Sequence, residues 1–149
     1  MGRATHILVP CRFLAATWYF VAVVMALYSV DANVGASRTR AGAGVGAAWA
    51  AAGGGDAGAA AASCTAALVV SALLLAGCQA SLLCGGTLML DRLSFAHAVC
   101  GLAGGALTTA YVLEAWPWQG AWWLCGILAL PPALAEAATL VALSRFVDW

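Results

Sequence analysis

The chain has 149 residues, of which 64% are hydrophobic and only 8% are charged, and its mean hydropathy is +0.96. That composition leaves too little polar surface to cover a soluble globule, so it predicts an integral membrane protein. Six arginines balance six acidic residues and lysine is absent. Because no basic excess is available to neutralise phosphates, nucleic acid is excluded as an expected partner and the lipid bilayer is predicted instead.

The first apolar run, residues 13–30, contains no charged residue. It is longer than the hydrophobic region of a typical secretory signal and about long enough to cross a bilayer, so we expect a first membrane span there. Residues 1–12 are then a cytosolic N-terminus. A cleaved signal peptide is the alternative, because Val34-Gly35-Ala36 fits the small-x-small cleavage pattern.

Residues 31–63 separate the first apolar run from the second and consist largely of alanine and glycine in their central part. Glycine opposes helix formation, and the segment has no hydrophobic period on which to fold. The sequence therefore predicts a flexible, non-cytosolic loop, with a short alanine helix near residues 59–62 as the alternative.

Three further apolar runs predict three more membrane spans: residues 64–90, 93–113 and 122–143. Asp91 and Arg92 are expected to form a tight cytosolic turn, and a link this short predicts that the second and third spans are antiparallel neighbours. Residues 114–121 are expected to form a non-cytosolic turn rich in Trp and Pro. The predicted fold class is an all-α, four-helix transmembrane bundle.

The arginines give the expected orientation of this bundle. Four of them fall on one side of a four-span chain: Arg3, Arg12, Arg92 and Arg145. The other two, Arg38 and Arg40, fall in the long loop on the opposite side. The positive-inside rule then places both termini, including residues 144–149, in the cytosol.

Tryptophans mark the expected membrane boundary before the fourth span. Four of the seven lie within eight positions: Trp116, Trp118, Trp122 and Trp123. Because tryptophan collects at the border between water and lipid, we expect these side chains to be interfacial anchors.

Gln79, His97 and Glu136 are polar residues expected at membrane depth. At about 1.5 Å per residue, His97 lies roughly 6 Å, Glu136 roughly 10 Å and Gln79 roughly 16 Å from the cytosolic ends of their spans. We therefore expect the three to make polar contacts in the cytosolic half of the bundle. Contacts that hold helices together are favoured over a proton or ion relay, because one acid and one histidine are few for a conduction path. In a purely structural role, Glu136→Gln should leave assembly nearly unchanged.

Small residues predict where helices pack closely. The stripes lie in the second and third spans: Gly77, Ser81 and Gly85, then Gly101 and Gly105. In the fourth span, Pro131 and Pro132 lack backbone N–H groups, so they are expected to kink or locally unwind the helix.

Motifs for catalysis, cofactor binding or metal binding are missing from the sequence. It has no paired carboxylates, no Gly-x-Ser-x-Gly elbow and no Cys-x-x-Cys pair. His97 and Cys100 alone supply two of the four ligands that zinc prefers, and Cys78 reads as a small buried hydrophobe. We therefore expect no enzyme, no cofactor or metal site and no small-molecule substrate.

Four short motifs, in order along nearly the whole chain, resemble those of the transmembrane protein 107 family. They are LVPCRFL at 8–14, SVDAN at 29–33, LEAW at 113–116 and LPPALAE at 130–136. The resemblance implies a four-span, non-enzymatic scaffold of the membrane at the ciliary transition zone. It further implies partners among Meckel-syndrome (MKS complex) and tectonic-type proteins, and a role in cilium assembly and in gating ciliary membrane composition. The alternative from another class is a small transporter or channel that uses Glu136 and His97.

Overall fold

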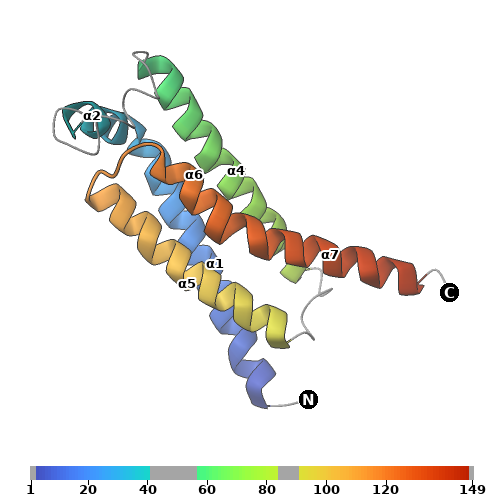
Figure 1. Cartoon of the computed structure of the whole chain (residues 1–149). Helices are drawn as coiled ribbons and strands as arrows, with labels where there is room; N and C mark the ends of the chain where they lie inside the picture. The colour runs from blue at the N-terminus through green and yellow to red at the C-terminus, as the bar shows by residue number, and fades with distance from the viewer. Residues whose placement is uncertain (1–2, 41–56, 84–90, 148–149) are drawn as a thin grey trace.

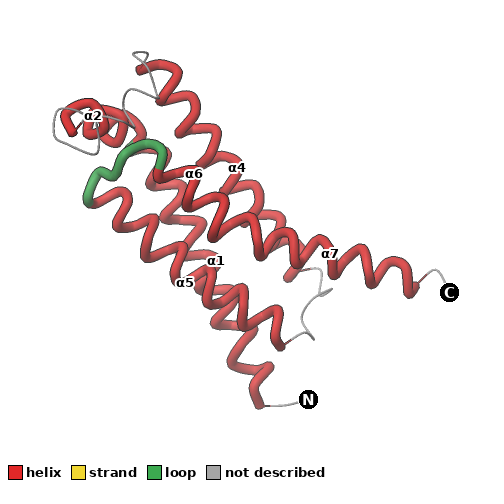
Figure 2. Tube along the Cα trace, in the orientation of Figure 1, coloured by secondary structure: helices red, strands yellow, loops and turns green. Residues whose placement is uncertain are grey.

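The computed structural model describes residues 3–40, 57–83 and 91–147, and these residues are almost entirely helical (Figures 1 and 2). The elements are α1 (Arg3–Tyr28), α2 (Val30–Arg40), α4 (Ala57–Leu83), α5 (Asp91–Leu113), α6 (Gly120–Leu124), the π-helical turn η1 (Cys125–Ala129) and α7 (Leu130–Val147). In this described part, four helices are long and apolar enough to cross a membrane: Ile7–Tyr28, Ala57–Ser81, Arg92–Leu113 and Gly120–Ala142. The predicted all-α, four-span fold is confirmed.

The four long helices form a ring in which α1 and α7 are the diagonal partners. Helix α1 packs most extensively against α5 and also against α4, while α7 packs against α4 and α5 (Figure 1). Within the described residues α4 and α5 have no comparable contact, so the expectation that the second and third spans are neighbours was wrong. The glycine-lined face of α5 lies against α1.

Several helix boundaries differ from the expected ones. Helix α1 begins at Arg3, so Arg12 lies inside a span rather than before it. The expected loop at 31–63 is helical at both ends, because α2 follows α1 directly and α4 begins at Ala57; residues 41–56 lie outside the described part. The alanine-rich start of α4 agrees with the alternative of a helix near 59–62, since alanine is the strongest helix former. Asp91 and Arg92 belong to α5.

Polar contacts fix α2 and the turn between α5 and α6 at one end of the bundle. The Asn33 amide donates to the Ser29 hydroxyl at 3.2 Å, and the Trp118 backbone N–H donates to the Ser37 hydroxyl at 3.1 Å. Ala115 has a φ of 46°, which lets the chain leave the end of α5, and the Trp116 N–H donates back to the Tyr111 carbonyl. The hydrogen bond from the Trp118 backbone to Ser37 therefore joins α2 to the turn before α6.

The fourth span is irregular one turn before its two prolines. In η1 the Leu130 N–H donates to the Cys125 carbonyl, five residues back rather than four, and α7 then continues through Pro131 and Pro132. The hydroxyl of Tyr19 donates to the Leu124 carbonyl at 3.3 Å, which supplies a donor where the helix changes its hydrogen-bond register. We expected the helix to kink or unwind at the prolines. The irregularity instead lies before them, as the π turn η1.

Both termini lie at the end of the bundle opposite α2 (Figure 1). Because Arg12 is buried between helices, it no longer counts as a loop charge, and the arginine bias becomes three against two. We still predict that tags fused to either terminus face the cytosol, because Arg3, Arg92 and Arg145 remain on that side. Reagent labelling of intact cells should miss both terminal tags and reach a tag inserted between residues 40 and 57. The opposite labelling pattern would reverse the orientation.

Candidate functional site

A buried ion pair joins the two diagonal helices of the bundle. The Nη2 atom of Arg12 on α1 lies 2.8 Å from Oε1 and 2.7 Å from Oε2 of Glu136 on α7. The two side chains are only 2% and 3% exposed. Charge-assisted hydrogen bonds to both oxygens satisfy the acid that the sequence placed at membrane depth, and they hold together helices whose pairing residues are 124 positions apart.

The position of Arg12 follows from the small residues on its helix face. Ala15, Ala16 and Tyr19 are buried at the following positions on the same face of α1, three, four and seven residues after Arg12. The sequence interpretation missed this residue because it assigned Arg12 to the cytosolic N-terminus, before the first span. The sequence does contain an indication of this role, because Arg12 is followed at helical spacing by small and aromatic residues.

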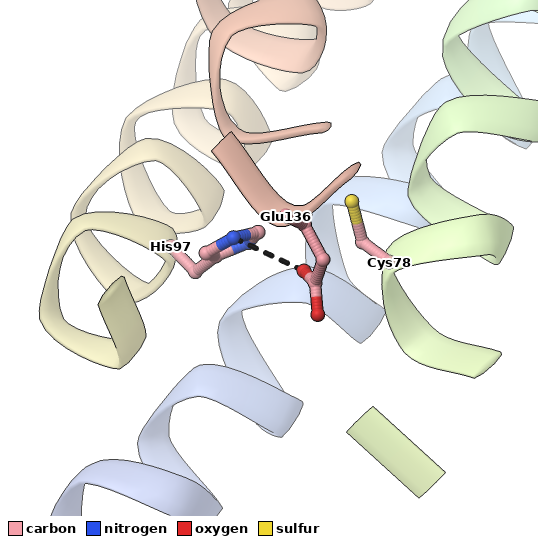
Figure 3. A group of neighbouring side chains, drawn as sticks. All are labelled: Cys78, His97 and Glu136. Atoms are coloured by element: carbon pink, nitrogen blue, oxygen red, sulfur yellow. Dashed lines mark ion pairs between the residues drawn. The ribbon is translucent and has the colours of Figure 1, made fainter. Parts of the chain in front are cut away.

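His97 and Cys78 complete the group around Glu136 (Figure 3). The His97 Nε2 atom on α5 lies 3.1 Å from Glu136 Oε2, and the His97 side chain is 6% exposed. Cys78 on α4 lies on the other side of Glu136 from His97 (Figure 3). The ligand atoms of Cys78, His97 and Glu136 all lie within 4.8 Å of one another. Four helices therefore contribute a side chain to one buried polar cluster, consisting of Arg12, Cys78, His97 and Glu136.

Gln79 does not join this cluster, although we expected it to. Its amide nitrogen lies 3.4 Å from the Phe13 carbonyl and 3.4 Å from the Thr17 hydroxyl, both on α1. Adjacent residues on an α-helix point about 100° apart, so the face of α4 that brings Cys78 to Glu136 turns Gln79 toward α1. The expectation that Gln79, His97 and Glu136 meet was right for the last two residues only.

A cavity of about 230 Å³ opens beside the cluster, between α4 and α7. Its walls include Cys78 and Glu136 at the cluster, with Gly77 and Ser81 on α4 and Ala137 on α7. A Cβ atom at Gly77 would meet nothing within 4 Å, so within this chain Gly77 is not the packing residue we expected. The Ser81 hydroxyl has no hydrogen-bond partner among the described residues, and Gly85 lies outside them.

The glycines of α5 do lie at a helix contact. A Cβ atom at Gly101 would lie 3.0 Å from the Ala15 backbone, and one at Gly105 would lie 2.9 Å from the Trp18 ring. Gly104, which the spacing rule did not identify, would place a Cβ 2.5 Å from the Tyr19 ring. All three glycines face α1, so they define the seam between these two helices.

The four tryptophans before the fourth span have different environments. Trp122 and Trp123 are exposed on the outside of the bundle, where interfacial anchors belong. Trp116 and Trp118 pack against the hydrophobic core. The Trp122 indole N–H also donates to the Ser63 hydroxyl at 3.0 Å, which links α6 to α4.

The polar cluster brings together side chains that can bind a metal ion, which the spacing of sequence motifs did not predict. A thiol, an imidazole and a carboxylate are the side chains that bind soft or borderline metal ions in proteins. They come from three different helices here, so no short sequence motif contains them. The expectation of no metal site was based only on residues close together in the sequence. The pairing of Arg12 with Glu136 neutralises the acid and favours a structural role for it over proton transfer.

Comparison with protein families gives a match that extends over nearly the whole chain. The family model described as TMEM107, transmembrane protein, matches residues 8–140. This range includes the buried ion pair, the glycine seam and the π turn. No curated protein and no solved structure matches the chain. The family match confirms the resemblance found in the sequence motifs: the chain belongs to the TMEM107 family of transmembrane proteins.

Proposed function

We propose that this protein is a non-enzymatic scaffold and assembly component of the membrane at the ciliary transition zone. There it would associate with Meckel-syndrome and tectonic-type membrane proteins, support cilium assembly and help gate which proteins enter the ciliary membrane. Family membership over residues 8–140 is the observation that carries this proposal.

The polar cluster supports a scaffold more than a carrier. Arg12 holds both carboxylate oxygens of Glu136, and an arginine stays protonated in proteins. A relay through Glu136 would have to break this pair at each cycle, which removes two charge-assisted hydrogen bonds. The second candidate, a small transporter or channel, is favoured only by the proximity of His97 to Glu136 and by the adjoining cavity.

Localisation in a ciliated cell tests the proposal. The full chain with a small C-terminal tag, expressed at low level, should concentrate at the base of the cilium, between markers of the basal body and of the axoneme. Purification through the tag should recover other membrane proteins of that zone. An unrelated four-span protein with the same tag is the control. A uniform signal over the cell membrane, with no such partners recovered, would contradict the scaffold and favour transport.

A further inference from the structure

The polar cluster contains one nitrogen atom whose bonding is incomplete. His97 Nε2 is buried and lies 3.1 Å from Glu136 Oε2, yet it has no hydrogen-bond partner of acceptable geometry among the described residues. Buried nitrogen atoms of side chains are nearly always hydrogen-bonded or ligate a metal. This atom faces Glu136, and Cys78 lies on the far side of the Glu136 side chain (Figure 3). Because one ligand atom of each of these three residues lies within 4.8 Å of the others, a partner of His97 is expected among them.

The geometry of the group suits a metal ion. The Cys78 sulfur and a ring nitrogen of His97 are at most 4.8 Å apart. An ion midway between them would therefore lie within about 2.4 Å of each, close to the distances of about 2.3 Å to sulfur and about 2.0 Å to imidazole nitrogen that are found in zinc sites. A small movement of either side chain would bring the ion to bonding distance of both.

Charge decides which ion fits. Arg12 already neutralises Glu136, so the cluster is neutral when His97 and the Cys78 thiol are uncharged. Metal binding replaces the thiol proton, which leaves to solvent, and the resulting thiolate contributes one negative charge. A monovalent cation keeps the cluster neutral, whereas a divalent cation leaves one positive charge buried between apolar helices. Burying such a charge is costly, so the arrangement disfavours Zn²⁺.

The ligands are soft, and among the monovalent cations found in biology this favours Cu(I). Thiolate sulfur selects Cu(I), and imidazole is a good ligand for copper. Sodium and potassium are hard cations, for which a thiolate and an imidazole are poor ligands. The cavity of about 230 Å³ that reaches Cys78 and Glu136 gives access to the site from the space between α4 and α7.

We propose that Cys78 and His97 bind one Cu(I) ion in the core of the bundle, beside the Arg12–Glu136 pair. Cys78 and His97 are the two ligands, and Glu136 flanks the ion as a weak third contact while it remains paired with Arg12. This site is independent of the scaffold role, because it follows from the described side chains alone.

The test uses the full chain in detergent micelles, with its five other cysteines replaced by alanine so that Cys78 is the only thiol. Cu(I), supplied without oxygen and buffered by a colorimetric Cu(I) chelator, should bind with a stoichiometry of one ion per chain. Cys78→Ser and His97→Gln in this background should each lose that equivalent. Leu102→Ala, an exposed position on the same helix as His97, is the matched control and should retain it.

X-ray absorption of the loaded protein should show one sulfur and one nitrogen ligand, and an excess of Zn²⁺ should not displace the ion. Gel filtration and tryptophan fluorescence monitor folding of each variant. Absence of Cu(I) binding by the folded Cys78-only protein would overturn the proposal. So would full binding by folded Cys78→Ser or His97→Gln protein, or preferential binding of Zn²⁺ at these residues.

Discussion

Arg12→Met should destabilise the bundle by about 3–5 kcal/mol, because it leaves the carboxylate of Glu136 buried without the guanidinium that neutralises it. Glu136→Gln should have a similar effect, since it leaves the Arg12 charge in the same position. The sequence alone predicted that Glu136→Gln would be tolerated, and the presence of Arg12 reverses that expectation. Denaturant unfolding of the purified protein in micelles, followed by tryptophan fluorescence, measures both.

The double variant Arg12→Met/Glu136→Gln is the decisive comparison. It removes both charges and fills the position of Arg12 with a flexible apolar side chain, so it should recover most of the lost stability. Arg145→Met, at an exposed position near the end of α7, controls for the loss of an arginine and should change little. If each single variant is as stable as the native chain, or if the two losses simply add in the double variant, the ion pair does not hold the bundle together.

Gly101→Leu should separate α1 from α5. The first atom of the new side chain would already lie 3.0 Å from the backbone of Ala15, and a backbone cannot turn aside as a side chain can. The two helices must therefore move apart, losing dispersion contacts along the whole seam, and an overpacked contact of this kind costs at least about 1–3 kcal/mol. Insertion into the membrane should persist, since leucine is favourable in lipid. The measurement is thermal unfolding, together with co-purification of partners from ciliated cells.

Gly77→Leu is the matched control for this glycine substitution. Both residues lie in membrane spans, but a Cβ at Gly77 would meet nothing within 4 Å. The two variants therefore add the same side chain to different environments. Gly105→Leu should have an intermediate effect, because the atoms it meets belong to the Trp18 ring, which is partly exposed and can rotate. Equal stability of Gly101→Leu and Gly77→Leu would show that the seam tolerates an added side chain.

The membrane spans were predictable because their signal is local. An uninterrupted apolar run must become a helix in lipid, where every backbone group needs an internal partner, and residues 93–113 correspond closely to α5. The glycines at 101 and 105 were also visible as a spacing. Helix α2 was not, because its sequence has no apolar periodicity and its hydrogen bonds depend on Ser37 meeting Trp118, 81 residues away.

The polar cluster could be predicted only in part, for a physical reason. His97 and Glu136 were identifiable because polar residues in lipid need partners, but their partners come from other helices. Choosing Cys78 over Gln79 requires the rotation of α4 about its own axis, which packing sets. Recognising Arg12 required knowing that α1 begins ten residues before the apolar run at residue 13. The short link between the second and third spans likewise did not reveal which helices pack together, because α5 packs most extensively against α1.

The diagonal ion pair also bears on how the chain is made. Helix α1 emerges from the ribosome before α7, and Arg12 and Glu136 are separated by 124 positions. Until α7 arrives, the long Arg12 side chain is best accommodated by reaching toward lipid headgroups. Only when Glu136 enters the membrane can the guanidinium move inward. In a product truncated before Glu136, the Arg12 side chain would stay near the lipid headgroups. This position of Arg12 would distinguish an incomplete chain from a complete one.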